Sequence, residues 1–262
     1  MRYINKNQSD QGWLHFIRSE EANMVLKYFP EGENLKILEI GGGDGYIASI
    51  FSDNGYAVTS IDIKPRFPQS FPVQKVSRSK LAFPDKTFDI IFSSNVLEHV
   101  VELDVLLKET KRVAKKDAIM IHVMPTPVWR LITSFWYVLR VTKTIFMKLT
   151  VFHKKNETNQ NDNESFYINN ESEKRQTLGM KLKRILLHPH GEYPSFIHEF
   201  YYFSKIRWRN IFKTNEFECL HVYRCPLIYS GESVFKFRFI PLRKYIANNI
   251  FSAGYIFILN SR

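Results

Sequence analysis

The fold of this chain is decided by the stretch Lys36-Ile37-Leu38-Glu39-Ile40-Gly41-Gly42-Gly43-Asp44-Gly45-Tyr46. An apolar run ends at Ile40, glycines follow, and an apolar pattern at helical spacing resumes at Ile47. The sequence therefore predicts a buried strand, a tight turn and a helix. Such a turn leaves backbone N–H groups bare and lets a ligand approach without meeting a Cβ atom.

A second apolar strand, over residues 56–63, ends in the carboxylate of Asp62. An acid roughly 20 residues after a glycine-rich turn can accept hydrogen bonds from both hydroxyls of a ribose. Two structural interpretations stand beside this one. In the first, Gly42 and Gly45 have a purely structural role in closing the turn. In the second, Asp62 is a capping residue or a solvated loop residue.

The spacing of the glycines distinguishes between two nucleotide cofactors. The dinucleotide fingerprint G-x-G-x-x-G is not cleanly met, whereas the pattern E-x-G-x-G-x-G resembles motif I of the class I S-adenosylmethionine-dependent methyltransferases. The resemblance implies an α/β, Rossmann-like fold with a seven-stranded, mostly parallel sheet and helices on both faces. It also implies S-adenosylmethionine as cofactor. Glu39 would help position its methionine end, Gly41, Gly43 and Gly45 would pass beneath it, and Asp62 would hold its ribose.

Residues 81–100 resemble the fourth strand of that family with its flanks, which is a more specific match than the glycines. We expect the residues at the carboxyl ends of the strands to complete the cofactor site; these are Ile63, Asn95, Val96 and Leu97. Many relatives carry an acid four positions before the Leu of the Leu-Pro-Phe element, where this chain has Ser77. Adenine recognition is therefore expected to rely on Ser77, on backbone groups or on stacking.

Histidines are the candidate general bases, because their unperturbed pKa lies near neutrality. His99 follows the fourth strand, although Glu98 and His99 can also simply open the next helix. A second cluster includes His190, His198 and Glu199, which can close over the acceptor. Without cysteines or a helical H-x-x-x-H pair, the sequence favours no metal site there.

We interpret residues 1–262 as a single domain with four parts. Residues 1–34 hold a leading helix, over 11–30, that should cover the cofactor edge; 35–125 form the cofactor-binding core. A helical or loop insertion over 126–199 precedes the last helix and strands, and its polar stretch 156–176 predicts a mobile surface loop. Residues 200–262 complete the sheet and end in a basic-aromatic tail. The family resemblance covers 35–125 well and 200–225 loosely.

The composition agrees with an intracellular enzyme. The chain is 44% hydrophobic, enough for a full core, and its two cysteines, Cys219 and Cys225, are too few for a disulfide framework. The first ten residues lack the apolar stretch of a signal peptide, so we expect a cytoplasmic location.

The net charge of +11 is concentrated in two stretches that mix aromatic rings with cations and lack acids, 118–156 after Asp117 and the tail after Glu232. Cations interrupt the apolar run well short of the ~18 residues of a membrane span. An interfacial helix on an anionic membrane face and a lid helix packed on the core remain as alternatives of similar weight. Nucleic-acid binding ranks below both, because no recognised module accompanies the charge.

These patterns together predict a methyltransferase that O-methylates a hydroxyl of a saccharide or lipid-linked saccharide, as in surface-polysaccharide assembly. The basic-aromatic insertion is the only support for the lipid part. The alternatives are a lipid or quinone-like acceptor and, in a different class, a non-catalytic cofactor-binding or RNA-associated protein. The sequence leaves the acceptor atom and the oligomeric state undetermined.

Overall fold

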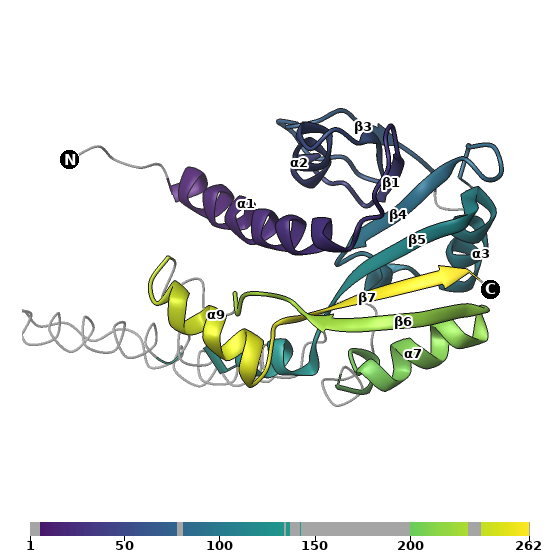
Figure 1. Cartoon of the computed structure of the whole chain (residues 1–262). Coiled ribbons are helices and arrows are strands. Elements are labelled where there is room, and N and C mark those ends of the chain that lie inside the picture. Colours follow the sequence, from purple (N-terminus) through teal and green to yellow (C-terminus); the bar gives the residue numbers. More distant parts are fainter. Residues whose placement is uncertain are drawn as a thin grey trace, which may run out of the picture.

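The computed structural model of the chain describes residues 6–77, 81–133, 135, 136, 142, 200–229 and 237–261. Within them, a seven-stranded sheet has the order β3-β2-β1-β4-β5-β7-β6 (Figure 1). β7 runs antiparallel to both of its neighbours, and the other neighbouring pairs are parallel. The strands are β1 (Lys36–Ile40), β2 (Ala57–Asp62), β3 (Val73–Lys75), β4 (Phe88–Ser94), β5 (Ala114–Pro125), β6 (Phe217–Arg224) and β7 (Gly254–Ser261). The predicted α/β sheet is confirmed.

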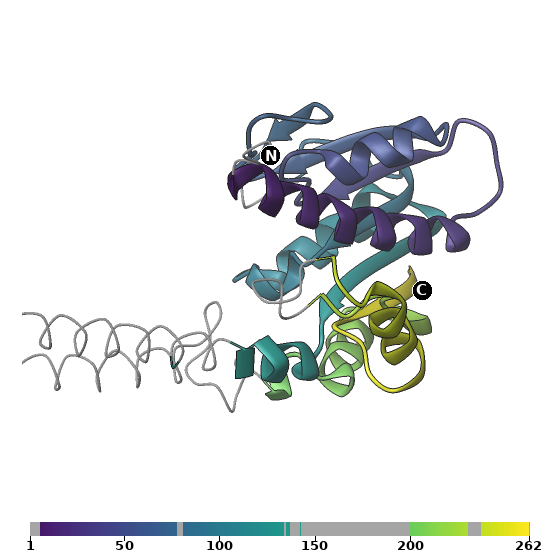
Figure 2. The same cartoon turned by 90° about the vertical axis from the view of Figure 1, so that its left-hand side faces the viewer.

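Helices connect and cover these strands. The α-helices are α1 (Lys6–Val25), α2 (Tyr46–Asp53), α3 (Leu103–Val113), α7 (Lys205–Thr214) and α9 (Ile240–Asn249), with the 3-10 turns η1 (Leu26–Tyr28) and η2 (Leu97–His99). The leading helix starts earlier and ends earlier than the predicted range 11–30. Figure 2 shows α1 as a long helix lying across the molecule beside α2.

The two faces of the sheet carry separate halves of the core, because neighbouring side chains in a strand point to opposite faces. Ile37 belongs to the cluster that packs under α1 and α2, together with Ala22 and Phe51. Leu38, the next residue, belongs to the cluster under α3 and α7, together with Trp208. Both faces of the parallel strands are therefore buried, which explains why β1 reads as an unbroken apolar run apart from Glu39.

β5 differs from the expected strand over 118–123. It begins at Ala114, which pairs with Phe88, and the register then shifts so that Ile90 pairs with Ile119. The residues between, Lys115 to Asp117, are exposed and form an irregularity in the ladder. The polar triplet that interrupts the apolar pattern is thus a bulge within the strand.

The turn from α7 into β6 departs from the glycine that relatives carry. Glu216 adopts a left-handed backbone with φ of 63°, a conformation that costs a non-glycine residue roughly 1 kcal/mol. Its side chain pairs with Lys111 of α3 at 2.7 Å. Cys219 lies within β6 and Cys225 directly after it, and both are free thiols, as expected.

Candidate functional site

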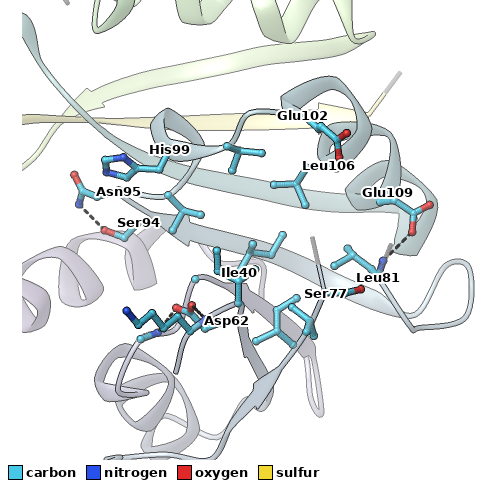
Figure 3. A pocket seen from close by; sticks show the side chains of 18 of the residues that line it. Ile40, Asp62, Ser77, Leu81, Ser94, Asn95, His99, Glu102, Leu106 and Glu109 are labelled. Atoms are coloured by element: carbon cyan, nitrogen blue, oxygen red, sulfur yellow. Dashed lines mark hydrogen bonds between the residues drawn. The ribbon is translucent and has the colours of Figure 1, made fainter. Parts of the chain in front are cut away.

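A cavity of about 690 Å³ opens at the carboxyl ends of β1, β2 and β4, facing α3 (Figure 3). This edge is where an open parallel sheet places its ligands. His99 lines this cavity, and so do most of the residues predicted to bind the cofactor. These predicted cofactor-binding residues are Gly41, Gly43, Asp62, Ile63, Ser77, Asn95 and Val96. The predicted cofactor-binding residues therefore gather around one cavity at the predicted edge of the sheet.

The glycine turn is held against the end of β2 by its own backbone. The N–H groups of Gly41 and Gly42 both donate to the carbonyl of Ile61, at 2.8 and 3.0 Å. Gly41 has φ of 78°, and a Cβ there would collide with the side chain of Val96. The turn thus needs glycine both for its backbone and for the close approach of the β4 loop.

Gly45 and Leu97, also predicted to bind the cofactor, do not line either of the two cavities, and their binding role stays a prediction. A Cβ on Gly45 would meet the carbonyl oxygen of Phe71, so this glycine is required by the packing of the β2–β3 loop. The side chain of Leu97 is buried in the core cluster with Leu107. Both residues thus have packing contacts that account for their type.

Asp62 ends β2 at the rim of the cavity. Its Oδ2 accepts from the N–H of Gly43 at 2.9 Å, and its Oδ1 accepts from the N–H of Lys64 at 2.7 Å. Each carboxylate oxygen can accept more than one hydrogen bond. The backbone therefore fixes the orientation of the carboxylate and leaves it able to accept hydrogen bonds from hydroxyl groups of a ligand in the cavity.

Glu39 lies beneath the turn instead of pointing into the large cavity. Its carboxyl is buried and accepts from the hydroxyl of Ser60 at 2.5 Å. Burial raises the pKa of Glu39 to about 7, reinforced by Asp44 and Asp62 and opposed by Ser60 and Arg18. Glu39 thus supports the turn from below and reaches only the second, smaller cavity.

That second cavity, of about 30 Å³, lies on the other side of Gly41, between the turn and α1. Two cations and two acids line it, namely Arg18, Arg66, Glu39 and Asp44. An α-amino acid group carries one positive and one negative charge, so this lining complements both ends of such a group. α1 contributes Arg18 to this cavity, while its role in covering the cofactor edge stays a prediction.

Arg18 is the principal residue that the sequence analysis missed. Its Nη1 donates to Glu21 at 2.6 Å and to the hydroxyl of Ser94 at 2.7 Å, which ties α1 to the end of β4. Burial disfavours the charge of Arg18 but Glu21 outweighs it, so the pKa of the guanidinium is raised. An arginine followed three residues later by a glutamate, in a helix expected to cover the site, was the available signal.

His15 fixes α1 further along. Its ring stacks on Tyr46 with centroids 3.9 Å apart, and its Nε2 lies 3.2 Å from Oδ2 of Asp44. The start of α2 and the glycine turn are thus both in contact with α1.

The loop after β4 places Asn95 and Val96 in the wall of the large cavity. Asn95 adopts φ of 54°, which asparagine tolerates better than most residues, and its N–H donates to the carbonyl of Val123 at 2.8 Å. Its side-chain amide donates to Ser94. The loop is thereby anchored to β5, and its conformation is set by the sheet.

His99 and Glu98 follow this loop in η2. The side chain of His99 is 51% exposed toward the cavity, and its Nε2 lies 3.9 Å from Oε1 of the buried Glu98. Burial raises the pKa of Glu98 to about 8. The other predicted catalytic residues, His190, His198 and Glu199, lie outside the described residues, so His99 is the one that this geometry places.

Ser77 lines the cavity at the position where relatives carry an acid (Figure 3). Across from it, Glu109 of α3 accepts from the N–H of Leu81 at 3.0 Å and pairs with Arg112. Because those bonds already hold Glu109 in place, it ties α3 to the loop after β3. Glu109 therefore does not take the place of the acid that relatives carry at the position of Ser77.

The described part of the basic-aromatic tail gives its cations structural roles. Arg243 is buried, donates to the carbonyl of Ile228 at 2.6 Å and lies 4.8 Å from the ring centre of Trp13. Lys244 pairs with Glu20 of α1. The large exposed side chains on α9 and directly before and after it are Phe237, Phe239, Leu242, Tyr245 and Ile250. The predicted mobile stretch 156–176 lies outside the described residues.

Two negative findings concern only the described residues. Among them, no helix combines the length and apolarity needed to cross a membrane. No group of three or more metal-ligating side chains comes together in the same part of the chain.

A family model described as a methyltransferase domain matches residues 13–222. Among curated proteins, an uncharacterized methyltransferase of Mycolicibacterium gilvum is 32% identical over 105 residues, which are 37% of this chain and 40% of that protein. A ubiquinone biosynthesis O-methyltransferase of Pelagibacter ubique is 31% identical over 98 residues, covering 34% of this chain and 41% of that protein. The alignments thus span about 40% of the length of these relatives.

Solved structures resemble the chain over its whole length. A Thermotoga maritima protein described as an S-adenosylmethionine-dependent methyltransferase, possible histamine N-methyltransferase, superposes with a TM-score of 0.54. It is 16% identical and covers 98% of this chain and 96% of its own. At that identity the likeness establishes the fold alone.

Proposed function

Because this chain belongs to the methyltransferase-domain family, we propose that it binds S-adenosylmethionine and catalyses methyl transfer to an acceptor hydroxyl. The observation that carries the proposal is the pair of cavities meeting over Gly41, one open and rimmed by Asp62, the other small and lined by charges of both signs. An adenosine and an amino-acid group joined end to end have this division of size and charge.

The residues present fit the cofactor at both ends. Asp62 would accept from the ribose hydroxyls, and the exposed side chain of Ile63 would lie against the adenine. Arg18 would pair with the α-carboxylate, since it already lines both cavities. When bound, S-adenosylmethionine supplies an electrophilic methyl group on a sulfonium; the protein then has to position an acceptor and exclude water.

His99 is the proposed general base. Its exposed imidazole borders the cavity beside Asn95, and it would take the proton of the acceptor hydroxyl, with Glu98 behind it orienting the ring. A positioned base contributes about 10²- to 10⁴-fold in rate. A His99→Gln variant should therefore lose activity while binding the cofactor normally.

We propose a saccharide or lipid-linked saccharide as the acceptor, on the cytoplasmic face of a membrane. The exposed apolar side chains of Phe239, Tyr245 and Ile250 on and around α9 support contact with a lipid surface, together with the basic charge of the chain. Liposome sedimentation tests this part. Binding to anionic but not zwitterionic vesicles, weakened by Phe239→Ser and Tyr245→Ser together, is the expected result, and no binding to either refutes it.

A lipid or quinone-like acceptor is the second candidate. The wall of the large cavity that belongs to α3 and the turn before it carries the exposed apolar side chains of Val101 and Val105, alongside the acids Glu102 and Glu109. A curated relative is named for O-methylation in ubiquinone biosynthesis. An acceptor screen that yields methylated aromatic lipids and no methylated sugars would favour this candidate.

The first experiment is calorimetric titration of the chain with S-adenosylmethionine and S-adenosylhomocysteine, followed by a methyl-transfer screen with sugars, lipid-linked sugars and aromatic lipids. Saturable binding and methyl transfer support the proposal. A folded protein that binds neither ligand contradicts it. That outcome, with RNA retention that falls steeply with salt, would point to the non-catalytic alternative.

A further inference from the structure

The small cavity cannot hold an amino-acid group as it stands. Its volume of about 30 Å³ has room for only two or three water molecules, since each needs about 10–15 Å³ of cavity, and an amino-acid group is larger than that. The two cavities share four lining residues, Arg18, Gly41, Arg66 and Ser94. A ligand that runs from the large cavity into the small one has to pass these four residues, so a movable side chain among them would admit it.

Three of the four shared walls are fixed. Gly41 is bonded to the end of β2, and Ser94 ends β4 and donates to Glu21. Arg18 is held by Glu21 and Ser94 at 2.6 and 2.7 Å. Moving Arg18 would leave the buried carboxyl of Glu21 without its cation, which is costly.

Arg66 is different. Its backbone N–H donates to the carbonyl of Gly43 at 2.8 Å, which anchors the loop after β2 over the turn. Its side chain is exposed, and within the described residues no hydrogen bond or ion pair holds the guanidinium. It lies directly over Gly43, where an added Cβ would be 3.0 Å from its Cζ. An exposed side chain of this kind changes rotamer within nanoseconds.

We propose that Arg66 is the movable wall of the amino-acid end of the site: it swings off Gly43 to admit the ligand and then pairs, opposite Arg18, with an α-carboxylate. The inference rests on the proposed binding of S-adenosylmethionine. Arg18 is the fixed half of this two-arginine site and Arg66 is the half that closes. The anchored backbone keeps the swing local, so the glycine turn is undisturbed.

The test compares two ligands that share the adenosine part. S-adenosylhomocysteine carries the α-amino acid group, and 5′-methylthioadenosine lacks it. Both are titrated into the wild type, Arg66→Met, Arg66→Lys and the control Arg209→Met, which removes an exposed arginine of α7. Dissociation rates of both ligands are measured in parallel.

We expect Arg66→Met to weaken S-adenosylhomocysteine about 10-fold, mostly through faster dissociation, as removal of a charged hydrogen-bond donor predicts. Arg66→Lys should retain part of the affinity. Methylthioadenosine should bind all variants alike, and Arg209→Met should match the wild type. An unchanged affinity for S-adenosylhomocysteine in Arg66→Met, or an equal loss for both ligands, overturns the proposal.

Failure of the underlying function is distinguishable. If the folded wild type binds neither ligand, the cofactor proposal falls and the role of Arg66 falls with it. If the wild type binds both and Arg66→Met changes neither, only the inference about Arg66 is refuted.

Discussion

The two ends of the proposed cofactor site are built in different ways. The large cavity is formed by the ends of three adjacent strands. Its key acid, Asp62, is oriented by two backbone N–H groups, that of Gly43 in the glycine turn and that of Lys64 just after β2. The small cavity gathers its charged side chains from α1, the end of β1, the glycine turn and the β2–β3 loop. The first end is preformed by the sheet, whereas the second depends on side chains that distant segments bring together. Variants that act on one end only can test this division.

The largest effect is expected at the preformed end. Asp62→Ala removes the acceptor for both ribose hydroxyls and the bond to Gly43, so affinity for S-adenosylhomocysteine and for methylthioadenosine should fall together by about 100-fold. Calorimetric titration measures both. A loss confined to one ligand would show that Asp62 does not act on their shared adenosine part. Asp62→Asn, which keeps the shape, should lose less.

At the assembled end, Arg18→Met should weaken S-adenosylhomocysteine by about 20-fold and leave methylthioadenosine nearly unchanged. The variant also removes the cation that pairs with the buried Glu21. Thermal unfolding should therefore show a free energy of unfolding lower by about 1–3 kcal/mol. Arg209→Met is the matched control. Equal weakening of both ligands would show that α1 contributes to the adenosine end as well.

The acids near Arg18 predict a pH dependence of stability. In the folded chain the pKa of Glu39 is about 7 and that of Glu98 about 8, against an ordinary value of 4.5. The folded state therefore holds protons that the unfolded state releases, and stability falls as pH rises from 6.5 to 8, by up to about 1.4 kcal/mol per pH unit for each group. Burial lowers the pKa of His122 from its ordinary value of 6.5 to about 4. His122 therefore changes the dependence of stability on pH only below pH 6.5.

Denaturant unfolding at pH 6.5, 7.2 and 8 measures this slope. Glu98→Gln should flatten it, and Glu216→Gln, at an exposed site, should leave it as in the wild type. A Glu98→Gln slope equal to that of the wild type would place the ionisation of Glu98 outside this range.

The smallest effect is expected from restoring the acid that relatives carry. Ser77→Asp offers an acceptor for the adenine amino group at the rim of the large cavity. One added hydrogen bond of about 1 kcal/mol corresponds to about 5-fold tighter binding, the same for both ligands because they share adenine. Weaker binding of both would show that the pocket recognises adenine in another way.

Much of the fold could be read from the sequence because its signals are local. Apolar runs, glycine positions and the acid at Asp62 identified β1, the turn, α2 and β2. The errors arose where a local pattern had a tertiary cause. Lys115 to Asp117 form a bulge inside β5, so this strand begins at Ala114 and not at Ala118 as the apolar pattern predicted.

The sequence by itself determined the α/β sheet, the edge of the sheet where the large cavity lies and most of the predicted residues that line this cavity. Periodicity and turn chemistry act over a few residues, so they survive in a single chain read without its fold. Only the tertiary structure placed Arg18 beside Ser94, 76 positions along the chain, and set Arg66 over Gly43. Such contacts depend on helix docking and loop closure, for which spacing along the chain carries no signal.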